Sequence, residues 1–385
     1  MNVVVIEKPH WSRRLAPWVR GFDAWLLLAF ALLAGVGLLT MYSVGFDFGS
    51  RFTDHARNLG IAIGVMLLFS QIPPHRLQLL GPPLYAVGVL LLIAVAWFGI
   101  SRNGAQRWLN LGIVVQPSEL MKIAMPLMLA WWFQRREGQM RALDFAVALV
   151  LLALPLALIV TQPDLGTSLL VLASGLFVIY FAGLRWRWIV PPLLIAAVGI
   201  VVLLIMSPQW CQDGVDWVVL REYQRQRVCT LIDPFRDPLG KGFHIIQGMI
   251  AIGSGGVWGK GYMQGTQTHL EFIPERTTDF IFAAYSEEFG LIGVVVLVLI
   301  FALLIGRGLV IAMRAPTLFS RLLAGAMALN IFVYAFVNMG MVSGILPVVG
   351  VPLPFVSYGG TAMATLGIGL GVLLAISRSD RLIKS

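Results

Sequence analysis

The sequence is poor in charge. Only 12% of its 385 residues are Asp, Glu, Lys or Arg, whereas 58% are hydrophobic, and the mean hydropathy is +0.84. A soluble domain of this length needs far more polar surface than these residues supply. The composition therefore excludes a soluble globular protein and indicates a polytopic membrane protein.

Several functional signatures are also absent. The sequence has no GxxxxGK[ST] motif, no low-complexity tract and no block of like charges. The segments expected in the cytoplasm are turns and tails, too short for a nucleotide-binding domain, which argues against ATP hydrolysis. No cleavable signal peptide is recognisable, because the basic N-terminal stretch leads directly into a full-length apolar run that begins near Asp23.

Apolar runs long enough to cross a bilayer as helices, which takes about 20 residues, recur along the whole chain. We predict one all-α transmembrane domain over residues 1–385, with about ten spans. They lie near 23–43, 57–71, 83–100, 117–134, 143–161, 165–183, 187–206, 279–306, 321–344 and 355–377. The one long connection, residues 207–278, separates the seventh span from the eighth.

The basic residues predict the orientation. With the N-terminus inside, the inner segments carry sixteen Lys and Arg residues, and the short outer segments with the adjoining helix starts carry five. Because short cytoplasmic loops are enriched in Lys and Arg, both termini are predicted to be cytoplasmic and the long loop external. The net charge of +9 follows from this topology, with attraction to anionic headgroups as a second effect, and does not point to a nucleic-acid partner.

The long loop contains both cysteines of the chain, Cys211 and Cys229. The outer side of an inner membrane is oxidising, so a disulfide between them and a pair of unpaired thiols are both open.

The same loop contains GSGGVWGKG, residues 253–261. Glycines let backbone N–H groups face an anion, and Lys260 adds positive charge, so this stretch is a candidate phosphate contact. The alternative is close packing of a flexible loop against the helices.

Four ionisable residues within spans stand out, because such charges are costly in a membrane and usually mark a site. Glu119 and Lys122 share a helix face in QPSELMKIAMP, Asp164 lies in TQPDLGTS, and Asp279 opens the span after the long loop. The topology brings all four to the outer face, which predicts a shared polar cavity. The structural alternatives are a Glu119–Lys122 ion pair and helix caps at Asp164 and Asp279.

Two further stretches border the same face. NGAQRWLNLG contributes Arg107 and Trp108 to the rim, and GILPVVGVPLPFVSYGG contributes Ser357 and Tyr358. The two hydroxyls are candidates for binding a headgroup, and a tight structural turn is equally compatible with this proline- and glycine-rich sequence.

Together these motifs identify a family. The chain resembles the SEDS family (shape, elongation, division and sporulation) over nearly its whole length, in AQRWLNLG, QPSELMK, TQPDLGTSLL, GSGGVWGKGYMQGTQTHLEFIPERTTDFIFA and NMGMVSGILPVVGVPLPFVSYGG. Division-type members usually carry a charged TKG-like turn where this chain has Val348, Val349 and Gly350. This difference favours the elongation type.

The resemblance implies a peptidoglycan glycosyltransferase of the bacterial inner membrane, with ten spans and a large external fourth loop. Its implied substrate is lipid II, which is polymerised into β-1,4 glycan strands with release of undecaprenyl pyrophosphate, for cell elongation and rod shape. The implied partners are a class B penicillin-binding protein transpeptidase and other elongation-complex membrane proteins. Asp279 matches the essential aspartate of the family, and Glu119, Lys122 and Asp164 carry over as site residues. The loop cysteines depart from the family pattern.

The implied chemistry is one inverting displacement, which needs a single carboxylate base, predicted to be Asp279. The charge of the leaving pyrophosphate calls for cations, which Lys122, Arg107 or Lys260 can supply. A divalent cation held by Asp164 or Glu119 is left open.

Three other functions remain as alternatives: a lipid II flippase, a division-type polymerase and a scaffold for the penicillin-binding protein. A flippase is expected to place its polar groups near the bilayer midplane. The sequence does not distinguish donor from acceptor subsites, and it does not show how the partner activates the enzyme.

Overall fold

The computed structural model describes residues 21–102, 105–110, 112, 114–211, 222–273 and 275–384. Each of the ten predicted apolar runs coincides with a helix. These helices are α2 (Ala24–Val44), α3 (Arg51–Ser70), α4 (Pro74–Phe98), α5 (Pro117–Gln134), α6 (Ala142–Thr161), α7 (Leu165–Phe181), α8 (Trp186–Trp210), α12 (Ile281–Arg314), α13 (Leu318–Val342) and α14 (Gly360–Lys384). Within the described residues, α2, α4, α6, α12, α13 and α14 are long and apolar enough to cross a membrane. The fold is that of a multi-pass helical membrane protein.

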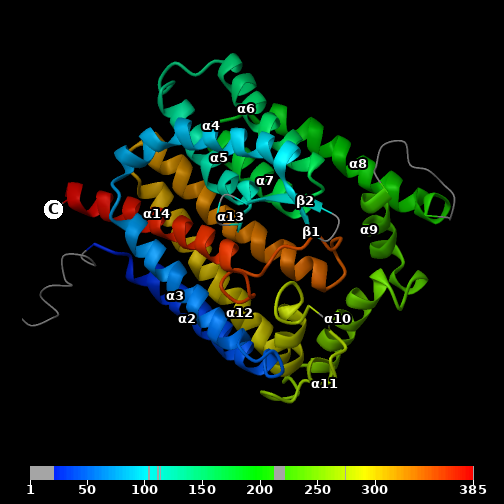
Figure 1. Ribbon diagram of the computed structural model, residues 1–385. Coiled ribbons are helices and arrows are strands. Elements are labelled where there is room, and N and C mark those ends of the chain that lie inside the picture. The colour runs from blue at the N-terminus through cyan, green and yellow to red at the C-terminus, as the bar shows by residue number, and fades with distance from the viewer. Residues whose placement is uncertain are drawn as a thin grey trace, which may run out of the picture.

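The helices form one bundle in which α13 and α14 are central (Figure 1). In their most apolar windows, 78% of the residues of α13 and 72% of those of α14 are buried, against 28% for α4, α6 and α12. The peripheral helices therefore turn apolar side chains outward, as a lipid-facing surface requires.

The beginning and the end of the described chain lie together at one end of the bundle (Figure 1). A Cβ atom built on Gly21 would lie 3.2 Å from Arg378 Cγ. Asp23 caps α2 by accepting from Leu26 N at 3.0 Å, and its carboxylate also binds Arg307 of α12 at 2.6 and 2.8 Å. This end is called the terminal end below, and the other is called the site end.

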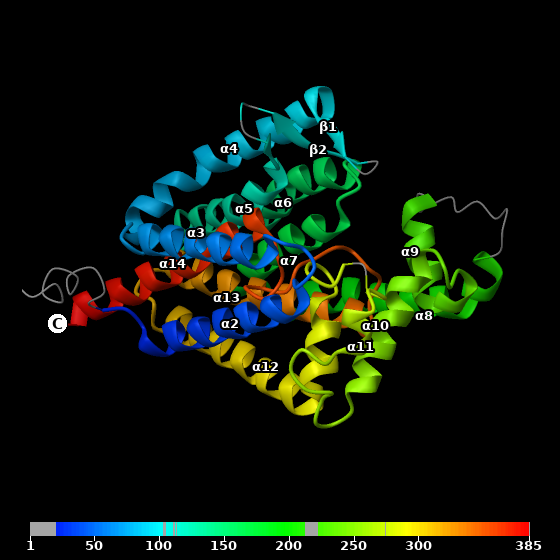
Figure 2. The same ribbon diagram turned by 60° about the horizontal axis from the view of Figure 1, so that its bottom comes forward.

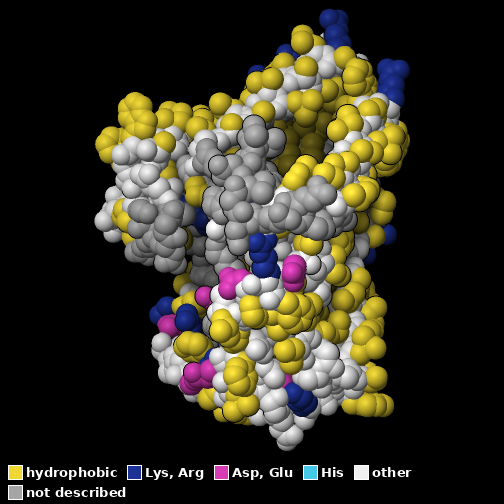
Figure 3. Space-filling view, turned by 90° about the vertical axis from the view of Figure 1, so that its right-hand side faces the viewer, with side chains coloured by type: hydrophobic (Ala, Val, Ile, Leu, Met, Phe, Trp, Pro, Cys, Tyr) yellow, Lys and Arg dark blue, Asp and Glu magenta, His cyan; other side chains and the backbone are white. Residues whose placement is uncertain are grey.

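The predicted long loop contains helices of its own. They are α9 (Glu222–Ile232), a short 3-10 helix (Pro234–Arg236), α10 (Lys241–Gly255) and α11 (Thr266–His269). A disulfide joins Cys211, which follows α8, to Cys229 in α9, so the bridged alternative is the one present. Helices α8 and α9 stand to one side of the bundle (Figure 2). Seen from that side, the surface is largely hydrophobic, and charged side chains gather in its middle and lower parts (Figure 3).

The glycine-rich stretch after α10 packs onto a kink in α12. The kink is at Gly290, whose φ is 63°. Lys260 N donates to Glu287 O at 3.0 Å, and Leu291 N donates to Gly256 O at 2.9 Å, so the turn supplies partners to backbone groups at the kink. This is the packing alternative considered for GSGGVWGKG.

A small sheet between α4 and α5 departs from the all-α prediction. It is antiparallel, in the order β1 (Ile100–Arg102), β2 (Ala105–Asn110) and β3 (Val114–Val115). Such short strands carry too few residues for a periodic pattern to be recognised. The sheet positions Arg107 and Trp108 on β2 at the site end, with Trp108 paired to Ile100.

Candidate functional site

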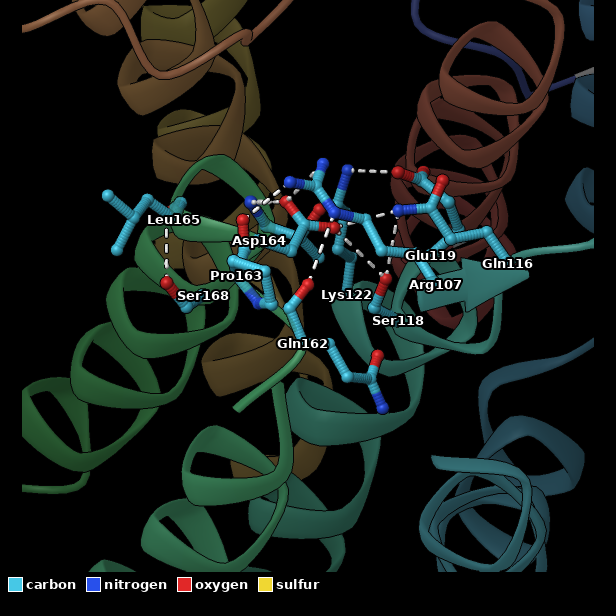
Figure 4. A network of polar contacts seen from close by, with 11 residues as sticks. Arg107, Gln116, Ser118, Glu119, Lys122, Gln162, Pro163, Asp164, Leu165 and Ser168 are labelled. Atoms are coloured by element: carbon cyan, nitrogen blue, oxygen red, sulfur yellow. Dashed lines mark hydrogen bonds and ion pairs between the residues drawn. The ribbon is translucent and has the colours of Figure 1, made fainter. Parts of the chain in front are cut away.

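Asp164 is at the centre of a polar network at the site end (Figure 4). One carboxylate oxygen, Oδ1, caps α7 by accepting from Thr167 N at 3.2 Å. The other, Oδ2, accepts from Gln116 Nε2 at 2.8 Å and from Ser118 Oγ at 3.5 Å. Asp164 is thus a helix cap and also joins the start of α5 to the start of α7.

Arg107 approaches the same network from β2 (Figure 4). Its guanidinium lies 3.8 Å from Asp164 Oδ1 and also donates to the backbone oxygens of Gln162, at 3.2 Å from Nε, and of Pro163. The arginine side chain keeps 28% of its surface exposed. Arg107 therefore holds the α6–α7 turn by hydrogen bonds, and part of its side chain stays exposed.

Glu119 and Lys122 form an ion pair of 2.6 Å on α5. Lys122 Nζ also donates to the hydroxyl of Tyr334 on α13 at 2.8 Å, and Thr365 of α14 donates to Glu119 Oε2 at 3.4 Å. The lysine side chain is 3% exposed. The pair joins three helices, in keeping with the ion-pair alternative, and the contacts compensate the burial of both charges.

Asp279 lies two residues before α12, in the turn that leads into this helix. Burial raises the pKa of Asp279 to about 6; the nearby Glu275 carboxylate adds to the rise, and the Arg227 guanidinium of α9 opposes it. Gly350 lies next to the carboxylate, because a Cβ atom at this position would lie 3.4 Å from Asp279 Oδ2. A carboxylate with this pKa is mainly ionised at neutral pH and is well matched to accept a proton.

Ser357 and Tyr358 hold the turn before Asp279. The Ser357 hydroxyl is buried and donates to Thr278 O at 2.6 Å, and Tyr358 N donates to Thr277 O at 2.8 Å. The Tyr358 ring lies under the Arg51 guanidinium, with 4.4 Å from Cζ to the ring centroid. The Ser357 hydroxyl therefore donates its hydrogen bond to another part of the protein, in keeping with the alternative of a structural turn.

The turn around Gly350 separates Asp279 from the Asp164 network. A Cβ atom on Gly166, two residues after Asp164, would lie 2.8 Å from Val349 O, while Gly350 faces Asp279 on the other side. The predicted ionisable residues therefore gather at one end of the bundle, in two groups on either side of one turn.

Lys260 lies away from both groups. Its ammonium binds Glu287 at 2.7 Å and Thr266 Oγ1 at 2.6 Å, and Glu287 also accepts from Gln267 N at 2.9 Å. The Glu287 side chain has no exposed surface. These contacts lock the segment around α11 onto α12, and a role of Lys260 in substrate binding stays a prediction.

No group of three His, Cys, Asp or Glu residues with metal-binding geometry occurs in the described part of the chain. Asp164 and Glu119, the two predicted metal ligands, belong to separate contacts with Gln116 and Lys122, respectively. The divalent cation left open by the sequence therefore has no preassembled ligand cluster among these residues.

A large cavity of about 720 Å³ lies between α10, α12 and α13. Its lining is almost entirely apolar and includes Phe282, Val294, Phe301, Phe336 and Met339. None of the side chains that line this cavity can take up a proton or neutralise a phosphate. We therefore place the candidate site at the polar site end of the bundle and not in this apolar cavity.

Sequence reasoning missed several residues that the fold brings to the site. Gln116 and Ser118 flank the predicted Glu119 and contact Asp164; their place in QPSELMK was the available signal. Arg227 of α9 acts electrostatically on Asp279, and Asn338 of α13 binds the backbone of Asp279. No sequence pattern pairs these last two positions with Asp279, because they are 52 and 59 residues away along the chain.

The fold and the site define a class: multi-pass helical membrane proteins with ionisable residues gathered at one end of the bundle. The chain belongs to the FtsW/RodA/SpoVE family, since the family model, described as a cell cycle protein, matches residues 24–382. This confirms the family predicted from the motifs.

Individual relatives match most of the chain. The peptidoglycan glycosyltransferase MrdB of Escherichia coli K12 is 49% identical over 355 residues, which cover 91% of this chain and 92% of MrdB. Among solved structures, a chain of a peptidoglycan synthase complex that coordinates polymerization and crosslinking matches with a TM-score of 0.76 at 33% identity, covering 93% of this chain and 98% of that one. The rod shape determining protein RodA of Thermus thermophilus matches with a TM-score of 0.69 at 27% identity, covering 94% and 99%.

Proposed function

We propose that this protein is a peptidoglycan glycosyltransferase that polymerises lipid II for cell elongation. The names of its relatives support the activity, and the 49% identity to MrdB supports the elongation type over the division type. One observation carries the proposal at the level of chemistry. Asp279 is held at the site end beside the Gly350 turn, and burial raises its pKa to about 6.

The proposed topology has ten spans in one domain, both termini in the cytoplasm and residues 207–278 outside the inner membrane. Two contacts at the terminal end support it: Gly21, just before α2, lies against Arg378 of α14, and Asp23, the cap of α2, binds Arg307 of α12. The predominance of Lys and Arg in the segments at that end supports a cytoplasmic location. The site end then faces outward, where the sugars of lipid II are.

In the proposed reaction, the 4-hydroxyl of the acceptor attacks the anomeric carbon of the α-linked donor. The new C–O bond forms on the face opposite the pyrophosphate, the old C–O bond breaks, and undecaprenyl pyrophosphate leaves with the bonding electrons. Asp279 takes the proton of the hydroxyl. One displacement inverts the anomeric centre and gives the β-1,4 link, so no second carboxylate is needed as a nucleophile.

The leaving pyrophosphate needs positive charge nearby. Of the three predicted cations, Lys122 is only 3% exposed and paired with Glu119, whereas Lys260 and Arg107 are 26% and 28% exposed. Lys260 is held at 2.7 Å by Glu287 and locks α11 onto α12, whereas Arg107 lies at a looser 3.8 Å from Asp164, within the polar network. We assign the pyrophosphate contact to Arg107. Arg51 joins it as a second candidate, since its guanidinium lies over Tyr358, whose N–H group binds the turn before Asp279.

The proposed partner is a class B penicillin-binding protein transpeptidase. The support is the solved peptidoglycan synthase complex, one chain of which shares this fold and which combines polymerization with crosslinking. A transpeptidase beside the glycosyltransferase would crosslink each strand as it emerges.

A direct test uses the purified protein with its partner, fluorescent lipid II in detergent, and gel separation of glycan strands. The wild type is expected to make strands, Asp279→Asn none, and Glu137→Gln, which removes an exposed carboxylate at the terminal end, wild-type amounts. Strands made without a membrane exclude a flippase that does nothing else. A wild type that makes no strands with its partner present, or an active Asp279→Asn, refutes the proposal.

A further inference from the structure

We propose that Asn338 is the positioning residue of the site: its side-chain amide holds the backbone of Asp279 and sets the gap between the Asp279 carboxylate and the Gly350 turn. The inference rests on the proposed function, in which Asp279 is the base. Asn338 itself touches neither the substrate nor the proton and acts through Asp279.

The contacts of Asn338 are specific. It lies on α13 with no exposed surface, and Nδ2 donates to Asp279 O at 2.9 Å and to Val351 O at 2.8 Å. Both N–H groups of the amide are therefore used, one on the residue that carries the carboxylate and one on the residue after Gly350. A single planar group thus ties the backbone of Asp279 to the turn that lies beside its carboxylate.

The neighbouring carbonyls show that the whole turn is held in this way. Three consecutive carbonyl oxygens before α12 each have a donor from α13 or the segment after it. Thr277 O accepts from Tyr358 N, Thr278 O from the Ser357 hydroxyl, and Asp279 O from Asn338. None of these bonds belongs to a helix, so the position of Asp279 depends on donors from distant parts of the chain.

The chemistry of the Asn338 side chain indicates why an amide is present. Its Oδ1 atom is buried and has no hydrogen-bond partner among the described residues, so the contacts come from the N–H groups alone. The opposite amide orientation would point Oδ1 at two carbonyl oxygens, which is repulsive and fixes the assignment of nitrogen and oxygen. An aspartate or a leucine of similar size supplies no such donors.

The loss of these donors has a consequence for catalysis that simple destabilisation lacks. A freed turn lets the Asp279 carboxylate move toward water, which reduces the burial that raises its pKa to about 6. The carboxylate also leaves the place where it meets the acceptor hydroxyl. A misplacement of about 1 Å can cost about 100-fold in rate, so the loss is expected in kcat, with little change in KM.

The experiment compares Asn338→Leu, which keeps the branched shape but no donor, with Asn338→Ser, which keeps one donor on a shorter side chain, in the purified protein with its partner. Polymerisation of fluorescent lipid II is followed from pH 5 to pH 8, and thermal unfolding is measured in parallel. For Asn338→Leu we expect kcat to fall between about 10- and 100-fold and KM for lipid II to stay within about two-fold. The acid limb of the pH profile of kcat, which reports the pKa of Asp279, should move to lower pH. Asn338→Ser should fall between the wild type and Asn338→Leu, and it provides the same readouts if the leucine variant does not fold.

Asn330→Ala is the matched control. Asn330 is a buried amide on the same helix with no hydrogen bond to the turn before Asp279, so its loss should leave the acid limb in place. If Asn338→Ser, or a folded Asn338→Leu, keeps wild-type kcat and acid limb, the inference fails. It also fails if Asn330→Ala reproduces the same changes. An active Asp279→Asn refutes the proposed function instead, and the two failures are therefore distinguishable.

Discussion

Replacing Asp279 by asparagine should make the protein inactive and, at neutral pH, more stable. The fold keeps an ionised carboxylate in a site whose burial raises its pKa from 3.8 to about 6. A pKa difference of one corresponds to about 1.4 kcal/mol, so the ionised form costs the folded state up to about 3 kcal/mol. Asparagine is nearly the same size and carries no charge, so it removes this cost.

The sign of the pH dependence follows from the same values. The folded protein binds the proton more tightly than the unfolded chain, so the cost is fully present above pH 6. It shrinks as the pH falls from 6 toward 3.8 and is absent below that, where both states are protonated. The excess stability of Asp279→Asn should therefore be largest near pH 7.5 and decline toward pH 4.5.

The assay is thermal unfolding of the purified protein in detergent at several pH values, with Asp279→Asn and the wild type side by side. Glu137→Gln is the control, because its exposed carboxylate lies far from the site and should change nothing. A variant that is no more stable than the wild type at pH 7.5, or whose stability difference is the same at every pH, would refute the reasoning.

Three more predictions follow from the surroundings of the site. Glu275→Gln should move the acid limb of polymerisation to lower pH and Arg227→Gln to higher pH, because these side chains respectively raise and lower the pKa of Asp279; a pH profile of kcat measures both. Gly350→Ala should cost about 1–2 kcal/mol in the free energy of unfolding, since Gly350 has a φ of 74°, and it should also reduce strand synthesis on gels, because the methyl group contacts the carboxylate. Lys122→Met should destabilise the fold by up to about 3 kcal/mol in thermal unfolding, because it leaves the Glu119 carboxylate, which is only 14% exposed, without its ion-pair partner.

Each of these predictions has a matched comparison. Gly35→Ala is the control for Gly350, because Gly35 has open space around it, and an equal loss in both variants would contradict the argument. Replacing Glu119 and Lys122 together should restore much of the stability lost in Lys122→Met; a double variant as unstable as the single one would show that the ion pair is not the cause. Shifts of the acid limb in the same direction for Glu275→Gln and Arg227→Gln would exclude an electrostatic effect on Asp279.

The grouping of the candidate site residues at one end of the bundle was predictable from the sequence, because the cost of burying charge in a membrane is a local property. Glu119, Lys122, Asp164 and Asp279 were conspicuous in apolar runs, and all four lie at the site end. The roles of Lys260 and Ser357 were not predictable. A lysine in a glycine-rich loop and a serine in a tight turn have no preferred partner until Glu287 and Thr278 are brought to them.

The sequence by itself determined the class of the protein, the positions of its ten apolar helices and the charge asymmetry of its two ends. These depend on local composition, since about 20 apolar residues form a span wherever they occur. The tertiary structure alone decided that the Gly350 turn lies between Asp164 and Asp279, and that Asn338 holds the Asp279 backbone from α13. Contacts between residues tens to hundreds of positions apart depend on how the helices pack, and no local pattern encodes that packing. The proposed catalytic carboxylate, Asp279, was conspicuous in the sequence, and its surroundings were visible only in the fold.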